Sequence, residues 1–264
     1  MSVSATVYCG DCFEILPQLI HERVKVDCIF ADPPYFLSGE GTTNSGGKRV
    51  LVNKGDWDKP LTVEEKLTFN KHWISLCKEL LTDTGTIWVS GTLHNIFSVG
   101  EALEELGFYI INNITWQKTN PPPNLACRCF THSTETILWA KKSKKAKHCF
   151  NYNLMKEQNG GKQHKDVWTG ALTPLKEKKL GKHPTQKPMY LLNKIIQAST
   201  MVGNTILDPF CGSGTTGVAA TSLNRSFIGI EQDPDYVNLS KTRIEEAGCF
   251  VQIVGEQGED NNEK

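Results

Sequence analysis

The sequence lacks a net charge and lacks any long apolar segment. Its 29 lysines and arginines balance 29 aspartates and glutamates, so no overall positive field attracts nucleic acid. No apolar run approaches the ~20 residues needed to cross a bilayer, and we therefore expect no membrane partner. A secretory leader is also lacking, so the nine cysteines are expected to stay reduced in the cytoplasm. The length suits one α/β domain with an insertion.

Paired metal-ligand spacings are lacking as well. The groups that come closest to such a pattern are Cys9-x-x-Cys12, Cys127-x-Cys129 and His148-Cys149. They do not repeat in the two-by-two spacing typical of zinc sites. We therefore expect no metal.

A stiff corner follows the apolar, β-branched stretch 26–31, which predicts a buried strand. Pro33 and Pro34 must end that strand, because proline has no N–H for a sheet ladder. The carboxylate of Asp32 and a proline carbonyl can accept the two hydrogens of an exocyclic amine. Tyr35 can stack on the base that carries the amine, at about 1–3 kcal/mol. A plain strand-ending turn is the alternative.

A second unit lies near the C-terminus. Residues 205–208 predict a strand, 209–217 form a glycine-rich turn, and 218–223 predict a helix. A further strand ends at Glu231. This order of elements holds nucleotide-type ligands, because glycines allow close approach and the helix N-terminus presents free N–H groups. An acid about 20 residues beyond the turn suits two ribose hydroxyls.

Together these motifs resemble the S-adenosylmethionine-dependent amino-methyltransferases that act on DNA. D-P-P-Y at 32–35 and D-P-F-x-G-S-G-T-T at 208–216 are that family's signatures, in the order of its beta group. The resemblance also takes in 10–12, 55–59 and 183–188, so it spans nearly the whole chain. D-P-P-Y is more typical of adenine N6 enzymes, whereas cytosine N4 enzymes more often carry S-P-P-Y. Cytosine-N4 transfer therefore stays open as the alternative.

The resemblance also implies partners and site residues. Segments 112–139 and 166–168 are similar to adenine methylases of GATC restriction systems, which implies a restriction endonuclease with the same target; a homodimer is left open. The catalytic residues implied are Asp32, Pro33, Pro34 and Tyr35. Asp11 and Cys12 are assigned to the cofactor's adenine edge, and Thr185 and Lys187 to its methionine carboxylate. The full cofactor set implied is Asp11, Cys12, Asp32, His183, Thr185, Lys187, Asp208, Pro209, Phe210, Gly212, Ser213, Gly214, Thr215, Thr216 and Glu231.

Charge is unevenly distributed despite the neutral total. Residues 141–187 hold 13 lysines and no arginine against three acids, and residues 231–264 hold nine acids against three bases. Residues 141–182 lack periodicity and have no expected place in a sheet. We therefore assign them to target recognition, with lysines on phosphates; a merely solvated face is the alternative. The candidate base readers are Asn151, Asn153, Gln158, Asn159 and Gln163.

The predicted fold is a doubly wound, mostly parallel, Rossmann-like methyltransferase sheet with an antiparallel edge hairpin and a circularly permuted motif order. Residues 1–140 form its catalytic half, 141–182 the recognition insertion, and 183–254 the cofactor-binding half. Residues 255–264 are expected to be a disordered acidic tail. The polar, glycine-rich stretch 36–59 is expected to be mobile, either as a lid over the site or as a spacer.

Two other classes of protein share some of these features. A nicotinamide-dependent oxidoreductase has the same glycine turn and acid, but it has no use for the corner at 32–35. A non-catalytic DNA-binding module has no need of an intact Asp32 and Tyr35. DNA methylation is favoured because it uses both motifs.

Overall fold

The centre of the protein is one nine-stranded sheet in the order β11-β1-β10-β9-β2-β5-β7-β6-β8. The computed structural model describes residues 3–36, 42–45, 48–51 and 61–255. Its sheet strands are β1 (Ala5–Cys9), β2 (Val26–Ala31), β5 (Leu81–Gly91), β6 (Tyr109–Lys118), β7 (Thr134–Lys141), β8 (Val167–Gly170), β9 (Thr205–Asp208), β10 (Ser226–Glu231) and β11 (Val251–Val254). Neighbours are parallel except that β7 is antiparallel to both β5 and β6. The predicted fold class is confirmed.

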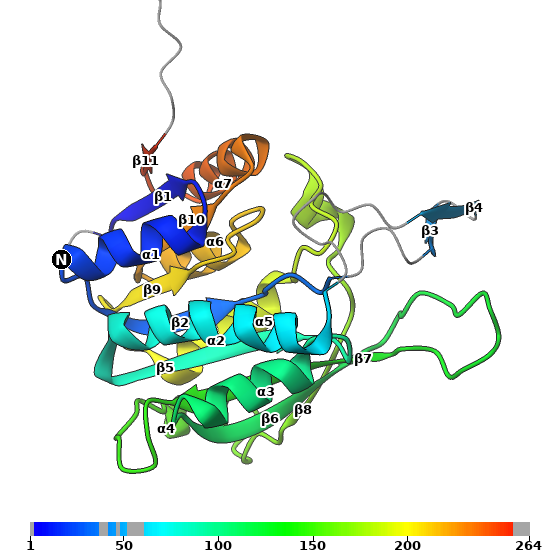
Figure 1. The fold of residues 1–264 in the computed structure, drawn as a ribbon, viewed down its shortest axis with the longest axis horizontal. Coiled ribbons are helices and arrows are strands. Elements are labelled where there is room, and N and C mark those ends of the chain that lie inside the picture. Colours follow the sequence, from blue (N-terminus) through cyan, green and yellow to red (C-terminus); the bar gives the residue numbers. More distant parts are fainter. Residues whose placement is uncertain (1–2, 37–41, 46–47, 52–60, 256–264) are drawn as a thin grey trace, which may run out of the picture.

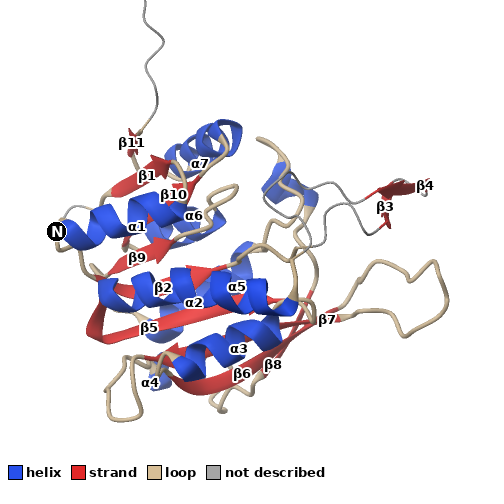
Figure 2. Ribbon diagram, in the orientation of Figure 1, coloured by secondary structure: helices blue, strands red, loops and turns tan. Residues whose placement is uncertain are grey.

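Helices cover both faces of the sheet (Figures 1 and 2). On one face, a core cluster joins the strands to α1 (Cys12–His21), α2 (Val63–Leu80) and α3 (Ile96–Glu105). On the other face, a second cluster joins them to α5 (Met189–Ser199), α6 (Thr215–Ser222) and α7 (Pro234–Glu246). Because apolar side chains lie on both sides, the central strands read as continuous apolar runs. None of the described helices is long and apolar enough to span a membrane.

Strand order brings the two sequence signatures together. Strands β2 and β9 are parallel neighbours, with Cys28 opposite Ile206 and Ile29 opposite Leu207. The carboxyl ends of both strands therefore lie along the same side of the sheet. Asp32, which follows β2, and Asp208, which ends β9, are brought close together there. We call this the catalytic edge. In open α/β sheets ligands bind at this edge.

The segment 141–182 differs from its prediction. It contains α4 (Tyr152–Gln158), the 3₁₀ turn η2 (Leu175–Lys178) and β8, which pairs in parallel with β6. The expectation that it has no place in the sheet was therefore wrong. The outermost strand on this side is β8, and not a strand of the hairpin β6–β7. Only Trp168 of β8 is buried, so this strand lacks the apolar run by which other short strands were recognised.

The first lysines of this segment lie far from the catalytic edge. Lys141 ends β7, which runs antiparallel to β5 and therefore also to β2. Lys142 donates a 2.9 Å hydrogen bond to the carbonyl of Leu81, at the start of β5. The lysine-rich turn 141–147 is thus at the opposite edge of the sheet, the green loop beside α4 in Figure 1. Lysine content alone gave no indication of which edge the turn occupies.

The stretch 36–59 is only partly described. Strands β3 (Thr42–Ser45) and β4 (Lys48–Leu51) pair as an antiparallel two-stranded sheet, where the sequence suggested no regular element. The remainder of the predicted lid lies outside the described residues, as does the predicted tail beyond Gly255.

Candidate active site

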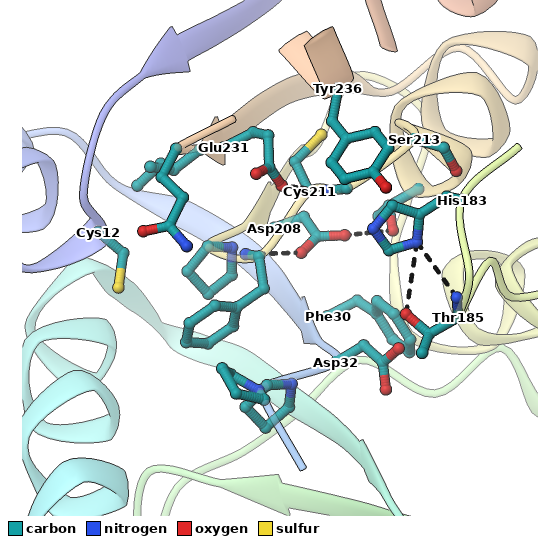
Figure 3. A pocket seen from close by; sticks show the side chains of 18 of the residues that line it. Cys12, Phe30, Asp32, His183, Thr185, Asp208, Cys211, Ser213, Glu231 and Tyr236 are labelled. Atoms are coloured by element: carbon teal, nitrogen blue, oxygen red, sulfur yellow. Dashed lines mark hydrogen bonds between the residues drawn. The ribbon is translucent and has the colours of Figure 1, made fainter. Parts of the chain in front are cut away.

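A cleft opens at the catalytic edge, and both signatures line it. Of the residues that the sequence assigned to the site, all but Gly214 contribute to the lining. Figure 3 shows Asp32, Asp208 and Glu231 in one space, although they come from three different strand ends. Segments some 175 positions apart in the chain thus line one cleft.

Buried hydrogen bonds from neighbouring side chains hold the glycine loop 208–216 in place. Asp208 accepts hydrogen bonds from the Phe210 N–H at 3.1 Å and the Thr216 hydroxyl at 2.5 Å. The guanidinium of Arg243, which the sequence reasoning missed, donates to Ser213 at 2.5 Å and 2.9 Å and to Thr215 at 3.0 Å. These contacts fix the loop before any ligand is present, so its N–H groups are preorganised.

Gly214 fixes the loop in another way. It has a left-handed φ of 74°, and a Cβ there would lie 2.8 Å from the Cα of Ser240 in α7. Only glycine allows this approach. Gly214 therefore shapes the cradle without lining it.

Glu231 is held at the end of β10. Its carboxylate accepts hydrogen bonds from the Gly212 N–H at 2.8 Å and the Asp233 N–H at 3.0 Å. Burial raises the pKa of Glu231 despite these two donors. Each carboxylate oxygen keeps a lone pair for a further donor, such as a hydroxyl.

Burial raises the pKa of Asp208 to about 7, against the lowering effect of the Thr216 and Phe210 donors. The folded protein therefore holds this proton more tightly than the unfolded chain does. Between the usual value of 3.8 and about 7, stability is expected to fall as pH rises. Asp208→Asn should flatten this part of the curve of thermal midpoint against pH, measured without ligand. An unchanged slope in the variant would show that Asp208 is ionised throughout.

The corner at Asp32 is more occupied than the sequence suggested. The hydroxyl of Tyr35 donates to Asp32 Oδ1 at 2.6 Å, and Lys187 Nζ donates to Oδ2 at 2.5 Å. Asn95 Nδ2 donates to the Pro34 carbonyl at 3.0 Å, which fixes the corner and was not foreseen. Tyr35 lines the cleft and is only 6% exposed, so its stacking on a base stays a prediction.

The ammonium of Lys187 lies between two acidic side chains, Asp32 and Glu135. Besides Asp32, its ammonium is 3.5 Å from Glu135 on β7, and Glu135 is 2.7 Å from Lys118 on β6. The nearby carboxylate of Asp32 raises the pKa of Lys187 against the lowering effect of burial. Glu135 and Lys118 were missed by the sequence analysis. They become neighbours through the register of the β6–β7 hairpin, which places Trp116 opposite Glu135.

The remaining predicted residues lie around the cleft. Asp11 accepts a 2.9 Å hydrogen bond from the Phe13 N–H and caps α1, while Cys12 is buried and burial raises the pKa of its thiol. The ring of His183 packs edge-on against Tyr236 at 4.4 Å. Thr185 approaches His183 Nδ1 at 3.4 Å. Among the candidate base readers, Asn151 instead donates to the carbonyls of residues 197 and 200, a structural role.

The donor set of this cleft fits S-adenosylmethionine. The carboxylate of Glu231 lines the cleft and keeps lone pairs that suit the two ribose hydroxyls. Gly212 has a left-handed φ of 52°, and a Cβ there would lie 3.2 Å from the ring of His183, so a glycine lets this loop pack closely against the turn that carries His183. Within the described part of the chain, no three His, Cys, Asp or Glu side chains are placed to hold a metal ion.

A doubly wound sheet with a preformed glycine loop at its carboxyl ends defines a nucleotide-binding protein of the α/β class. The family model described as DNA methylase matches residues 26–242, and the chain belongs to that family. M2.DpnII of Streptococcus pneumoniae, a type II methyltransferase, is 62% identical over 89% of this chain and 88% of its own. M2.MboI of Moraxella bovis, also a type II methyltransferase, is 51% identical over 91% and 87%.

Solved structures agree with this assignment. The complex of M1.HpyAVI with S-adenosylmethionine has a TM-score of 0.69 and 31% identity, over 91% of this chain and 98% of its own. The cytosine-N4-specific PvuII methyltransferase has a TM-score of 0.70 at 19% identity, which shows a shared fold alone. The predicted family, the DNA methyltransferase activity and S-adenosylmethionine as cofactor are confirmed. The nicotinamide-dependent alternative is set aside.

Proposed function

We propose that this protein transfers a methyl group to N6 of adenine in DNA, as the modification enzyme of a type II restriction system. The observation that carries this proposal is the corner Asp32–Tyr35, opening on the same cleft as the glycine cradle. Its D-P-P-Y sequence is the form typical of adenine enzymes. Support also comes from M2.DpnII and M2.MboI, both type II methyltransferases.

The corner's task is to position an amine and accept its hydrogens. S-adenosylmethionine supplies a methyl group that is already activated, so neither a nucleophilic side chain nor a metal is required. Asp32 accepts a hydrogen bond from the amine through Oδ1. In this structure the Tyr35 hydroxyl donates to that oxygen at 2.6 Å. Alignment and preorganised acceptors supply the catalysis. The base must first rotate out of the duplex, at a cost of a few kcal/mol.

The identity of the methylated base tests the proposed adenine specificity. Duplex DNA methylated by the purified protein is digested to nucleosides and separated by mass spectrometry. N6-methyladenine is the expected product. N4-methylcytosine alone would overturn the adenine assignment and leave the family intact. Sequencing the methylated DNA then tests the GATC-type target.

We further propose that DNA lies along the catalytic edge. The loop 119–133 joins β6 to β7 there and extends from the body in Figure 1. It carries an exposed Arg128 and a Phe130 that is 96% exposed. The recognition segment reaches the same edge only after β8, where Lys176 is exposed. Exposed aromatic and cationic groups beside the site suit unstacked bases and phosphates.

Paired variants at the two edges test this placement. Replacing Arg128 and Phe130 by alanine should weaken DNA binding roughly 10-fold or more, since a base stack is worth about 1–3 kcal/mol. Replacing Lys144 and Lys145, exposed at the opposite edge, should change it little. Fluorescence anisotropy of a labelled duplex measures both. The reverse ranking would place DNA on the lysine turn 141–147.

Two partners remain part of the proposal. A restriction endonuclease that cuts the same unmodified site follows from the type II assignment. A homodimer is left open by the sequence, and analytical ultracentrifugation of the purified chain decides between monomer and dimer.

A further inference from the structure

Four charged side chains form a buried row beside the catalytic corner. Their order is Asp32, Lys187, Glu135, Lys118, and charges alternate along the row. The nitrogen–oxygen distances are 2.5 Å, 3.5 Å and 2.7 Å. The side chains are 13%, 7%, 11% and 10% exposed, respectively. The members come from the end of β2, the turn before α5, and the facing strands β7 and β6.

Stability alone does not account for this row. Removing charges from water costs several kcal/mol per ion, and buried ion pairs are often replaced by apolar groups without loss. Within the described part of the chain, Glu135 Oε2 is buried and accepts no hydrogen bond. It faces the ammonium of Lys187 at 3.5 Å. The other oxygen of Glu135 is held by Lys118 at 2.7 Å, so Glu135 acts on Lys187 through its charge more than through a direct hydrogen bond.

We propose that Glu135 is a positioning residue for methyl transfer, which holds Lys187 between two carboxylates and keeps Asp32 able to accept a proton. The inference rests on the proposed role of Asp32. In the transfer, the amine nitrogen forms a bond to the methyl carbon, and the carbon–sulfur bond breaks with its electron pair going to sulfur. The amine then loses one proton, which passes to the carboxylate of Asp32 and from there to solvent.

The charges around Asp32 explain why Glu135 is needed. Lys187 touches Asp32 directly, and an ammonium at 2.5 Å makes a carboxylate a weaker base. Glu135 opposes this effect with its own negative charge. Tyr35, which donates to Asp32, and Asp208, the other acid of the cleft, also face the group. Burial raises the pKa of Asp32, Lys187 lowers it and Glu135 raises it.

Glu135→Gln keeps the shape of the side chain and removes its charge. Turnover should fall about 10-fold to 100-fold, because the amine acceptor is misplaced and less basic, while KM for both substrates stays within a few-fold. The sign of the pH effect follows from charge. Loss of a nearby anion lowers the pKa of Asp32, so the acidic limb of kcat/KM, where Asp32 becomes protonated, should move to lower pH.

Two further variants separate positioning from folding. Glu135→Asp keeps the charge and should keep the limb at the wild-type pH, even if turnover or stability drops. Glu105→Gln breaks an exposed ion pair with Lys71 and should leave kinetics unchanged. Wild-type turnover with an unmoved limb in Glu135→Gln would overturn the inference. So would a loss that follows thermal stability alone, with the limb unmoved.

If Glu135→Gln does not fold, Glu135→Asp decides. A limb of Glu135→Asp that moves to lower pH, although the negative charge is kept, would then refute a role of charge. A wild-type enzyme that methylates no adenine would instead refute the proposed function, so the two failures are distinguishable.

Discussion

Asp32→Ala is expected to lower turnover on the order of 10²–10³-fold, the range seen when one preorganised transition-state hydrogen bond is removed. Within the described part of the chain, the Asp32 carboxylate accepts its hydrogen bonds from Tyr35 and Lys187 and from no residue of the glycine loop. Binding of S-adenosylmethionine should therefore persist, because the cradle at 208–216 has its own support. Transfer of a labelled methyl group to duplex DNA measures the first quantity, and calorimetric titration measures the second.

The Asp32→Ala variant is expected to fold, because Lys187 keeps an acidic neighbour. Without Asp32, Lys187 still faces Glu135 at 3.5 Å, so its charge keeps a partner and the fold is expected to hold. Tyr35→Phe removes a donor to the same carboxylate and should cost much less. Wild-type turnover in Asp32→Ala would refute the role given to this carboxylate. Joint loss of turnover and cofactor binding would show that Asp32 belongs to the cradle instead.

Gly214→Ala is expected to destabilise the protein by roughly 2–6 kcal/mol. A left-handed non-glycine residue costs about 1–3 kcal/mol, and overpacking adds about 1–3 kcal/mol. At this position the new Cβ would meet Ser240 at 2.6 Å. The displaced loop should also bind S-adenosylmethionine more weakly. Urea unfolding and calorimetric titration measure the two effects.

Gly203→Ala is the matched control. Gly203 has a similar φ of 84°, but no atom lies within 4 Å of the added Cβ. Its variant should carry only the backbone strain and should bind the cofactor normally. Equal destabilisation of both variants would show that contact with α7 does not shape the loop.

Local chemistry made the strands and turns of the site readable. The strands at 26–31 and 205–208 were predicted with the bounds that the structure gives them. Prolines end one strand and a glycine turn follows the other, and both effects act within a few residues. The place of segment 141–182 in the fold was predicted wrongly, because its strand β8 and its helix α4 each bury a single side chain and leave no apolar pattern to detect. Asn151 was misassigned because composition does not show which amides support backbone.

Sequence by itself determined the two chemical parts of this protein: a rigid acidic corner for an amine and a glycine cradle for a nucleotide cofactor. Tertiary structure decided what surrounds them. It paired Asp32 with Lys187, placed Glu135 behind that lysine, and put the lysine turn at the far edge of the sheet. These relations depend on strand order and hairpin register, which packing between distant segments sets. No local rule within the chain specifies them.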